Sequence, residues 1–233
     1  MRPALSHPWD LSAKAATELQ ERLACRVITE DRLPERIRTV AGVDAAYRDE
    51  DSLAFAAVAI IDVTTSRLEE AVFATEPAHF PYVPGLLSFR EIPVLTAAFA
   101  KLTAKPDLVV CDGQGIAHPR RFGLACHIGV IYDLPAIGCA KTHLVGNAQE
   151  PDFKRGSFSP IVYEGETVGS LLRTRDGVKP LYVSSGHRIS LQTARDWVLT
   201  LSARYRIPEP IRLADQLVNK MKRDLVSRTI GKY

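Results

Sequence analysis

Residues 106–142 read PDLVVCDGQGIAHPRRFGLACHIGVIYDLPAIGCAKT, and this stretch decides the fold class. The apolar runs at its two ends, 106–113 and 135–142, are short, and the first ends in a glycine turn, which is typical of a buried strand. The longer apolar stretch between them, 122–134, predicts a buried helix. A strand, a helix and a strand in this order form the unit from which α/β sheets are built, so the sequence predicts an α/β fold.

Upstream of this unit, three β-rich runs follow one another closely at 39–47, 52–63 and 67–77. The linkers between them, RDED and TTS, are short and polar, which is typical of an antiparallel meander. An amphipathic helix is predicted before them at 10–24. Because antiparallel strands precede the strand-helix-strand unit, we expect a mixed sheet with helices packed on it.

The remainder of the chain supplies helices and a hairpin. Apolar residues at helical spacing predict a helix over 94–102, with Pro93 in its first turn. The elements predicted downstream are a hairpin from 160 to 173 with its turn at Glu164-Gly165, a turn at RDGV, a strand that runs into a helix over 190–205, and a final helix after Pro210. Since no clear linker divides the sequence, residues 1–233 are predicted to form a single domain.

Composition limits the classes of protein that fit. Hydrophobic residues make up 46% of the chain and charged residues 24%, which is ordinary globular usage and argues against disorder or a membrane span. The net charge of +3 permits a nucleic-acid partner without requiring one. The four cysteines show no C-x-x-C spacing, which argues against a zinc knuckle or a thioredoxin-like site. The amino terminus lacks the apolar core of a signal peptide, so we expect a cytoplasmic protein with reduced thiols.

Two aspartates occupy positions where a carboxylate is informative. Asp44 lies inside the apolar run VAGVDAAY, where a charge is costly unless it is paired or binds a metal ion. Asp112 follows LVVC at a strand end, where α/β proteins commonly place ligands. Each has a structural alternative, because Asp44 could pair with an arginine and Asp112 could cap the turn into Gly113-Gln114-Gly115.

Two further carboxylates become candidates in combination with these. Glu91 comes just before Pro93 at the predicted helix start, but it also stands at capping-box spacing from Ser88. Asp215 lies in RLADQLV on the final helix, where a solvated helix face is the structural alternative. All four could converge over the sheet, and oxygen ligands of this kind select Mg²⁺ or Mn²⁺ over zinc.

A carboxylate cluster that holds one or two such ions is suited to phosphodiester cleavage, because the metal activates water and stabilises charge on the reacting oxygens. Lys141, at the end of an apolar strand, could add positive charge to the same transition state, and a lysine that simply reaches solvent is the alternative. The loop DGQGIAHPRR carries His118 among glycines and arginines, a composition suited to close approach to a ligand. The six histidines show no zinc-ligand spacing such as H-E-x-x-H.

Several long segments resemble the endonuclease V family. The matching segments follow the family's order and span most of the chain. They are AGVDAAY at 41–47, PYVPGLLSFREIP at 81–93, VCDGQGIAHPRRFGLACHIGV at 110–130, PAIGCAKT at 135–142, VSSGHRISL at 183–191 and RLAD at 212–215. Matches of this length are far more specific than a lone short motif. The resemblance implies a ribonuclease H-like mixed β-sheet flanked by helices, and a single endonuclease V-like catalytic domain.

The resemblance also implies roles for individual residues. Asp44, Glu91 and Asp112 match the family's metal ligands, and Lys141 matches a lysine near the scissile phosphate. Asp215 matches a further metal-site position, where the family carries either Asp or His.

The segment PYVPG matches the family's strand-separating wedge, in which Tyr82 would fill the gap left by an extruded base. Hypoxanthine differs from adenine at its Watson–Crick edge, and backbone amides and carbonyls brought close by glycines can detect that difference. The residues predicted to bind substrate are Tyr82, Pro84, Gly85, Leu87, Gly113, His118 and Gly138.

Family members cut the second phosphodiester bond on the 3′ side of a deaminated base and leave a 3′-hydroxyl and a 5′-phosphate. The resemblance therefore implies a Mg²⁺-dependent DNA repair endonuclease in which Mn²⁺ can substitute. We expect the protein to be a monomer. Alternatives are a nuclease of the same fold acting on inosine-containing RNA or on flap and junction structures, a lesion sensor without catalysis, and an unrelated metal hydrolase. The intact set of carboxylates argues against the sensor, and the long matches argue against the unrelated hydrolase.

Overall fold

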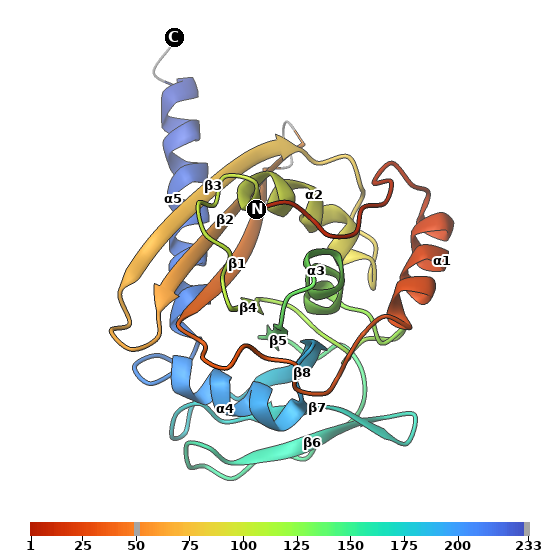
Figure 1. The fold of residues 1–233 in the computed structure, drawn as a ribbon, viewed down its shortest axis with the longest axis vertical. Helices are drawn as coiled ribbons and strands as arrows, with labels where there is room; N and C mark the ends of the chain where they lie inside the picture. The colour runs from red at the N-terminus through yellow and green to blue at the C-terminus, as the bar shows by residue number, and fades with distance from the viewer. Residues whose placement is uncertain (49–51, 231–233) are drawn as a thin grey trace.

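A computed structural model describes residues 1–48 and 52–230. Within these residues the strands form a single mixed sheet in the order β3-β2-β1-β4-β5-β8-β7-β6 (Figure 1). The strands are β1 (Thr39–Arg48), β2 (Leu53–Asp62), β3 (Leu68–Pro77), β4 (Leu108–Cys111), β5 (Ala136–Ala140), β6 (Phe158–Tyr163), β7 (Glu166–Leu172) and β8 (Leu181–His187). The helices are α1 (Ala13–Ala24), α2 (Leu87–Phe99), α3 (Leu124–Tyr132), α4 (Leu191–Leu201) and α5 (Glu209–Ile230).

The pairing of the strands confirms the predicted mixed sheet. β1, β2 and β3 pair antiparallel as a meander, whereas β4 lies parallel to β1 and to β5. The parallel pairs arise because α2 and α3 each return the chain to the same end of the sheet. The linker predicted at RDED includes residues 49–51, which lie outside the described residues. The linker TTS forms the turn between β2 and β3, where the Asp62 carboxylate accepts hydrogen bonds from the amides of Thr64 and Thr65.

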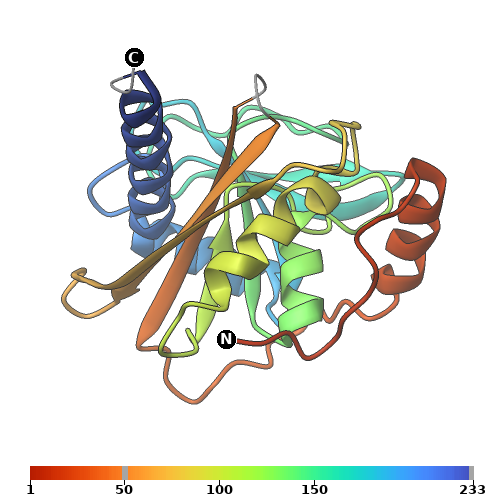
Figure 2. The same ribbon diagram turned by 90° about the horizontal axis from the view of Figure 1, so that it is seen from above.

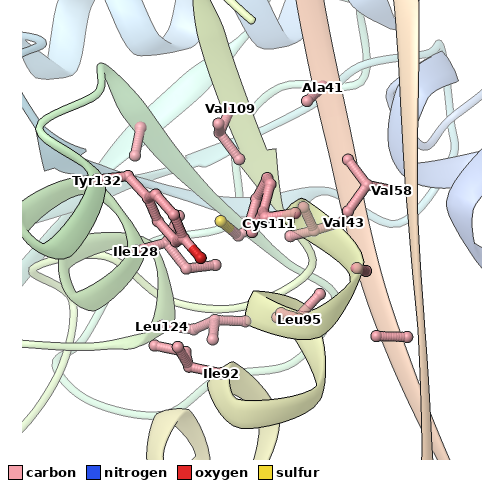
Figure 3. Close-up of a cluster of buried hydrophobic side chains, with 14 of the residues drawn as sticks. Ala41, Val43, Val58, Ile92, Leu95, Val109, Cys111, Leu124, Ile128 and Tyr132 are labelled. Carbon is pink, nitrogen blue, oxygen red and sulfur yellow. The ribbon is translucent and has the colours of Figure 1, made fainter. Parts of the chain in front are cut away.

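Helices cover both faces of the sheet (Figure 2). α2 and α3 pack on one face, and α4 and α5 pack on the other. The core under α2 and α3 is shown in Figure 3, where Ile92 and Leu95 of α2 meet Val43 of β1 and Cys111 of β4. α1 lies outside α3, away from the sheet (Figure 2). Within the described part of the chain, none of the helices has both the length and the apolar character that crossing a membrane requires.

The hairpin predicted from 160 to 173 forms as β6 and β7, and its turn is at Glu164-Gly165. Both turn residues have positive φ, +55° for Glu164 and +81° for Gly165. Two consecutive positive φ angles match the twist of the flanking strands, and glycine adopts such an angle without strain. The local sequence is therefore sufficient to place this turn.

The start of α2 corrects the sequence prediction. The helix begins at Leu87, six residues before Pro93, so Pro93 lies inside the helix and Glu91 lies in its second turn. Ser88 does not cap the helix. Its hydroxyl lies within hydrogen-bond distance of His127 Nδ1, at 2.9 Å. A proline inside a helix removes one backbone hydrogen bond, and the complete burial of Phe89 offsets that cost by placing the extra turn against the core.

Candidate active site

Two carboxylates lie side by side in the middle of the sheet, where the parallel pairing of β1 with β4 ends. Val43 of β1 is paired with Cys111 of β4, so Asp44, the next residue of β1, lies beside Asp112, which directly follows β4. Lys141 directly follows β5 on the far side of β4, and its Nζ lies 2.5 Å from Asp112 Oδ2. The parallel register therefore brings together two acids and one base that are far apart in the sequence.

Helices add one carboxylate from each face of the sheet. Glu91 is carried by α2, and it lies near enough to Asp44 and Asp112 for their charges to act on it. Asp215 is carried by α5, whose first turn packs so closely on β1 that a Cβ added to Gly42 would lie 2.0 Å from the Pro210 carbonyl carbon. This close packing brings Asp215 near enough for its charge to act on Asp44.

Burial and neighbouring carboxylates raise the pKa values of Asp44 and Glu91. Burial and the charges of Asp112 and Asp215 raise the pKa of Asp44 to about 7, against the opposing effect of Lys141. Burial, followed by the charges of Asp44 and Asp112, raises the pKa of Glu91 well above its ordinary value. Repulsion of this kind on Asp44 and Glu91 identifies a site with more negative charge than its own residues neutralise.

Lys141 is the basic partner of this cluster. Burial by itself lowers the pKa of Lys141, but the hydrogen bond and charge of Asp112, together with Asp44 and Asp215, raise it overall. The side chain keeps 40% of its surface exposed, whereas Asp112 keeps 15%. The ammonium group is therefore charged and able to reach a ligand in the cavity described next.

A cavity of about 410 Å³ opens over the carboxylates. The sequence-predicted residues that line it are Asp44, Tyr82, Pro84, Gly85, Leu87, Glu91, Asp112, Gly113, His118 and Lys141. Tyr82 stands at the rim with 67% of its surface exposed. The structure thus places the PYVPG segment and the carboxylates around one cavity.

Two predicted residues, Gly138 and Asp215, are not among those that line the cavity. Gly138 is in β5, and a Cβ there would lie 2.2 Å from the Gly115 amide nitrogen, so this glycine is needed to let the loop after β4 pack on β5. Asp215 faces Asn219 along α5, with 3.2 Å between Asn219 Nδ2 and Asp215 Oδ1.

The donor set fits a hard divalent cation. Carboxylate oxygens are the ligands that Mg²⁺ and Mn²⁺ prefer. Burial and, after it, repulsion raise the pKa values of Asp44 and Glu91, and a bound cation would offset the repulsion. Among the described residues, no three His, Cys, Asp or Glu side chains lie close enough together to coordinate an ion in their present positions. Asp44, Glu91 and Asp112, which line the same cavity, are the residues that could hold one.

Some residues that line the cavity were not predicted from the sequence. Gln20 of α1, Gln114 and the segment 142–144 also line the cavity. Gln20 could have been found from the sequence, because it is a polar residue on the helix face formed by the buried Ala16, Leu19 and Leu23. A polar side chain at such a position needs buried hydrogen-bond partners.

The chain matches the model of one protein family, Endonuclease V, over residues 21–216. It is 48% identical to endonuclease V from Nostoc sp. over 91% of this chain and 96% of that protein. The chain belongs to the endonuclease V family. As an endonuclease V it is a hydrolase of the deoxyribonuclease V type.

Solved endonuclease V structures share the fold. The crystal structure from Streptomyces avermitilis gives a TM-score of 0.89 at 42% identity and covers 95% of this chain and 98% of that one. Endonuclease V from Ciona intestinalis, in complex with a 24mer DNA containing an inosine followed by a ribo-adenosine, gives a TM-score of 0.79 at 26% identity and covers 90% of this chain and 97% of that one. The eight-stranded sheet is therefore the ribonuclease H-like sheet of endonuclease V.

Proposed function

We propose that this endonuclease V recognises hypoxanthine in DNA and hydrolyses the second phosphodiester bond on its 3′ side, leaving a 3′-hydroxyl and a 5′-phosphate. The whole chain works as one catalytic domain and as a monomer in the cytoplasm. One observation carries the proposal: the carboxylates and the PYVPG segment border the same cavity. The Ciona intestinalis complex with inosine-containing DNA supports the choice of ligand.

Some residues around the cavity bind the substrate, and others take part in catalysis. Tyr82, at the exposed rim, stacks in the gap that an extruded base leaves. Backbone groups of Gly85, Leu87 and Gly113 contact the Watson–Crick edge of the base, since these residues line the cavity beside the carboxylates. Lys141 approaches the scissile phosphate and stabilises the charge that develops there.

Asp44, Glu91 and Asp112 hold a divalent cation, Mg²⁺ in the cell and Mn²⁺ as a substitute, and Asp215 supports this group from α5. The bound ion would supply positive charge beside the scissile phosphate. Asp44 and Glu91 suit this role because burial and the charges of neighbouring carboxylates disfavour their negative charge when no cation is bound.

A cleavage assay on a labelled duplex tests the proposal. The duplex carries a single internal deoxyinosine, and an all-adenine duplex of the same sequence is the control. We expect one nick, one nucleotide beyond the inosine on its 3′ side, with Mg²⁺ and not with EDTA. Equal cutting of the control duplex, or cutting in EDTA, would contradict the proposal. An RNA strand with one inosine, assayed in parallel, decides between DNA and RNA as the better substrate.

Replacing Tyr82 with alanine is expected to lower the preference for the inosine duplex about tenfold, because the variant loses the aromatic surface that stacks beside the extruded base. Folding should be almost unaffected, since the side chain is 67% exposed. The preference is measured as the ratio of kcat/KM for the inosine and all-adenine duplexes. Tyr82→Phe keeps the ring and serves as the matched control. An unchanged ratio in Tyr82→Ala would remove the wedge role.

A further inference from the structure

The carbonyl oxygen of Gly85 is held by three side chains at once. Gln20 Nε2 donates to it at 3.1 Å, His118 Nε2 lies 3.0 Å away, and Arg120 Nη2 donates at 2.8 Å. Gly85 is the last residue of PYVPG and has a φ of +79°, a conformation that favours glycine. A carbonyl oxygen that accepts from three donors is fixed far more firmly than an ordinary loop carbonyl.

Gln20 joins this carbonyl to two other parts of the molecule. Its side chain is buried, with 1% of its surface exposed, although it belongs to α1 at the outside of the fold. Nε2 also donates to the Phe122 carbonyl at 2.7 Å, and Oε1 accepts from Arg120 Nε at 2.5 Å. Both amide hydrogens and the amide oxygen are therefore used, which fixes the orientation of the amide group.

The ring of His118 has a defined protonation state. The Arg120 amide donates to His118 Nδ1 at 3.2 Å, so the proton of the neutral ring is on Nε2, which donates to Gly85. Burial and the nearby charge of Arg120 lower the pKa of His118 to about 4, which keeps the ring neutral at physiological pH. Gln20, His118 and Arg120 thus form one connected hydrogen-bonded unit around the Gly85 carbonyl.

We propose that Gln20, together with Arg120, is a positioning residue that holds the PYVPG loop in the geometry required to select a deaminated base. This inference rests on the proposed function. The loop is anchored at its last residue, and α2 begins two residues later with Leu87, so the same anchor fixes the backbone around the base pocket. Gln20 acts through the Gly85 carbonyl and takes no part in the chemistry.

The test compares two variants of α1 that both remove buried interactions. Gln20→Met keeps the length of the side chain and loses its hydrogen bonds, whereas Leu19→Ala removes apolar contacts of the neighbouring residue in the cluster that contains Phe89. Each variant is assayed below its Tm on the inosine and all-adenine duplexes. We expect Gln20→Met to lower the ratio of kcat/KM values about tenfold, the effect of roughly one hydrogen bond. Leu19→Ala should lower Tm and keep the wild-type ratio.

A third variant separates the effect of the Gln20 amide hydrogens from that of its amide oxygen. Gln20→Glu keeps an oxygen for Arg120 but has no amide hydrogen for Gly85 or Phe122, so it should lose selectivity as Gln20→Met does. The inference is overturned if Gln20→Met keeps the wild-type ratio, or if Leu19→Ala loses the ratio equally. If the wild-type enzyme itself shows no preference for inosine, the proposed function fails, and the positioning role fails with it.

Discussion

Asp112→Asn is expected to reduce cleavage of the inosine duplex by roughly a thousandfold or more, the size of effect seen when a charged or polar group that stabilises the transition state is removed. Asparagine keeps the shape of the side chain but cannot carry the negative charge that holds a divalent cation. It would also weaken the 2.5 Å contact between Lys141 and Asp112, which orients the ammonium group. Asp44→Asn should behave alike, since Asp44 borders the same cavity.

The same variant should remain folded and should still bind the lesion. Asp112 raises the pKa values of both Asp44 and Glu91, so removing its charge relieves repulsion in the native state. We therefore expect a Tm no lower than that of the wild type, and measurable binding of the inosine duplex by fluorescence anisotropy. Asp196→Asn, an exposed position on α4, is the matched control and should cleave normally. Turnover close to that of the wild type in Asp112→Asn would refute the ligand role.

Gly42→Ala is expected to destabilise the protein by about 3 kcal/mol, because overpacking in a tight interior forces the backbone to shift. The added Cβ would lie 2.0 Å from the carbonyl carbon of Pro210 and 2.4 Å from the amide nitrogen of Ile211. Both are backbone atoms, which cannot rotate away as a side chain can. For a chain of this size, the loss corresponds to a fall in Tm of roughly 10 °C.

The variant should also lose activity at temperatures where it is still folded. α5 would have to move away from β1, and Asp215 is carried by α5, so its effect on Asp44 would weaken. Thermal unfolding followed by circular dichroism measures the stability, and the inosine duplex assay measures the activity. Ala71→Val, which enlarges an exposed residue of edge strand β3, is the control and should leave Tm within about 2 °C. A Tm for Gly42→Ala equal to that of the wild type would contradict the close packing of α5 on β1.

The sequence by itself determined most of the secondary structure and the class of sheet. The meander, the strand-helix-strand unit and the turn at Glu164-Gly165 follow from local patterns, because the alternation of apolar residues and the φ preferences of turn residues act over short stretches of chain. The position of Asp112 at a strand end was recognisable for the same reason. The resemblance carried by the long segments, residues 81–93 above all, predicted the family, which the comparisons confirm.

Only the tertiary structure decided how these pieces form a site. The start of α2 at Leu87 depends on burying Phe89 against the core, which no local rule about Pro93 can anticipate. The close approach of a distant loop to Gly138 is likewise visible only in the tertiary structure. Gln20 is matched to the Gly85 carbonyl 65 residues away. Such contacts are fixed by strand register and helix packing, which join residues that no short stretch of the sequence contains.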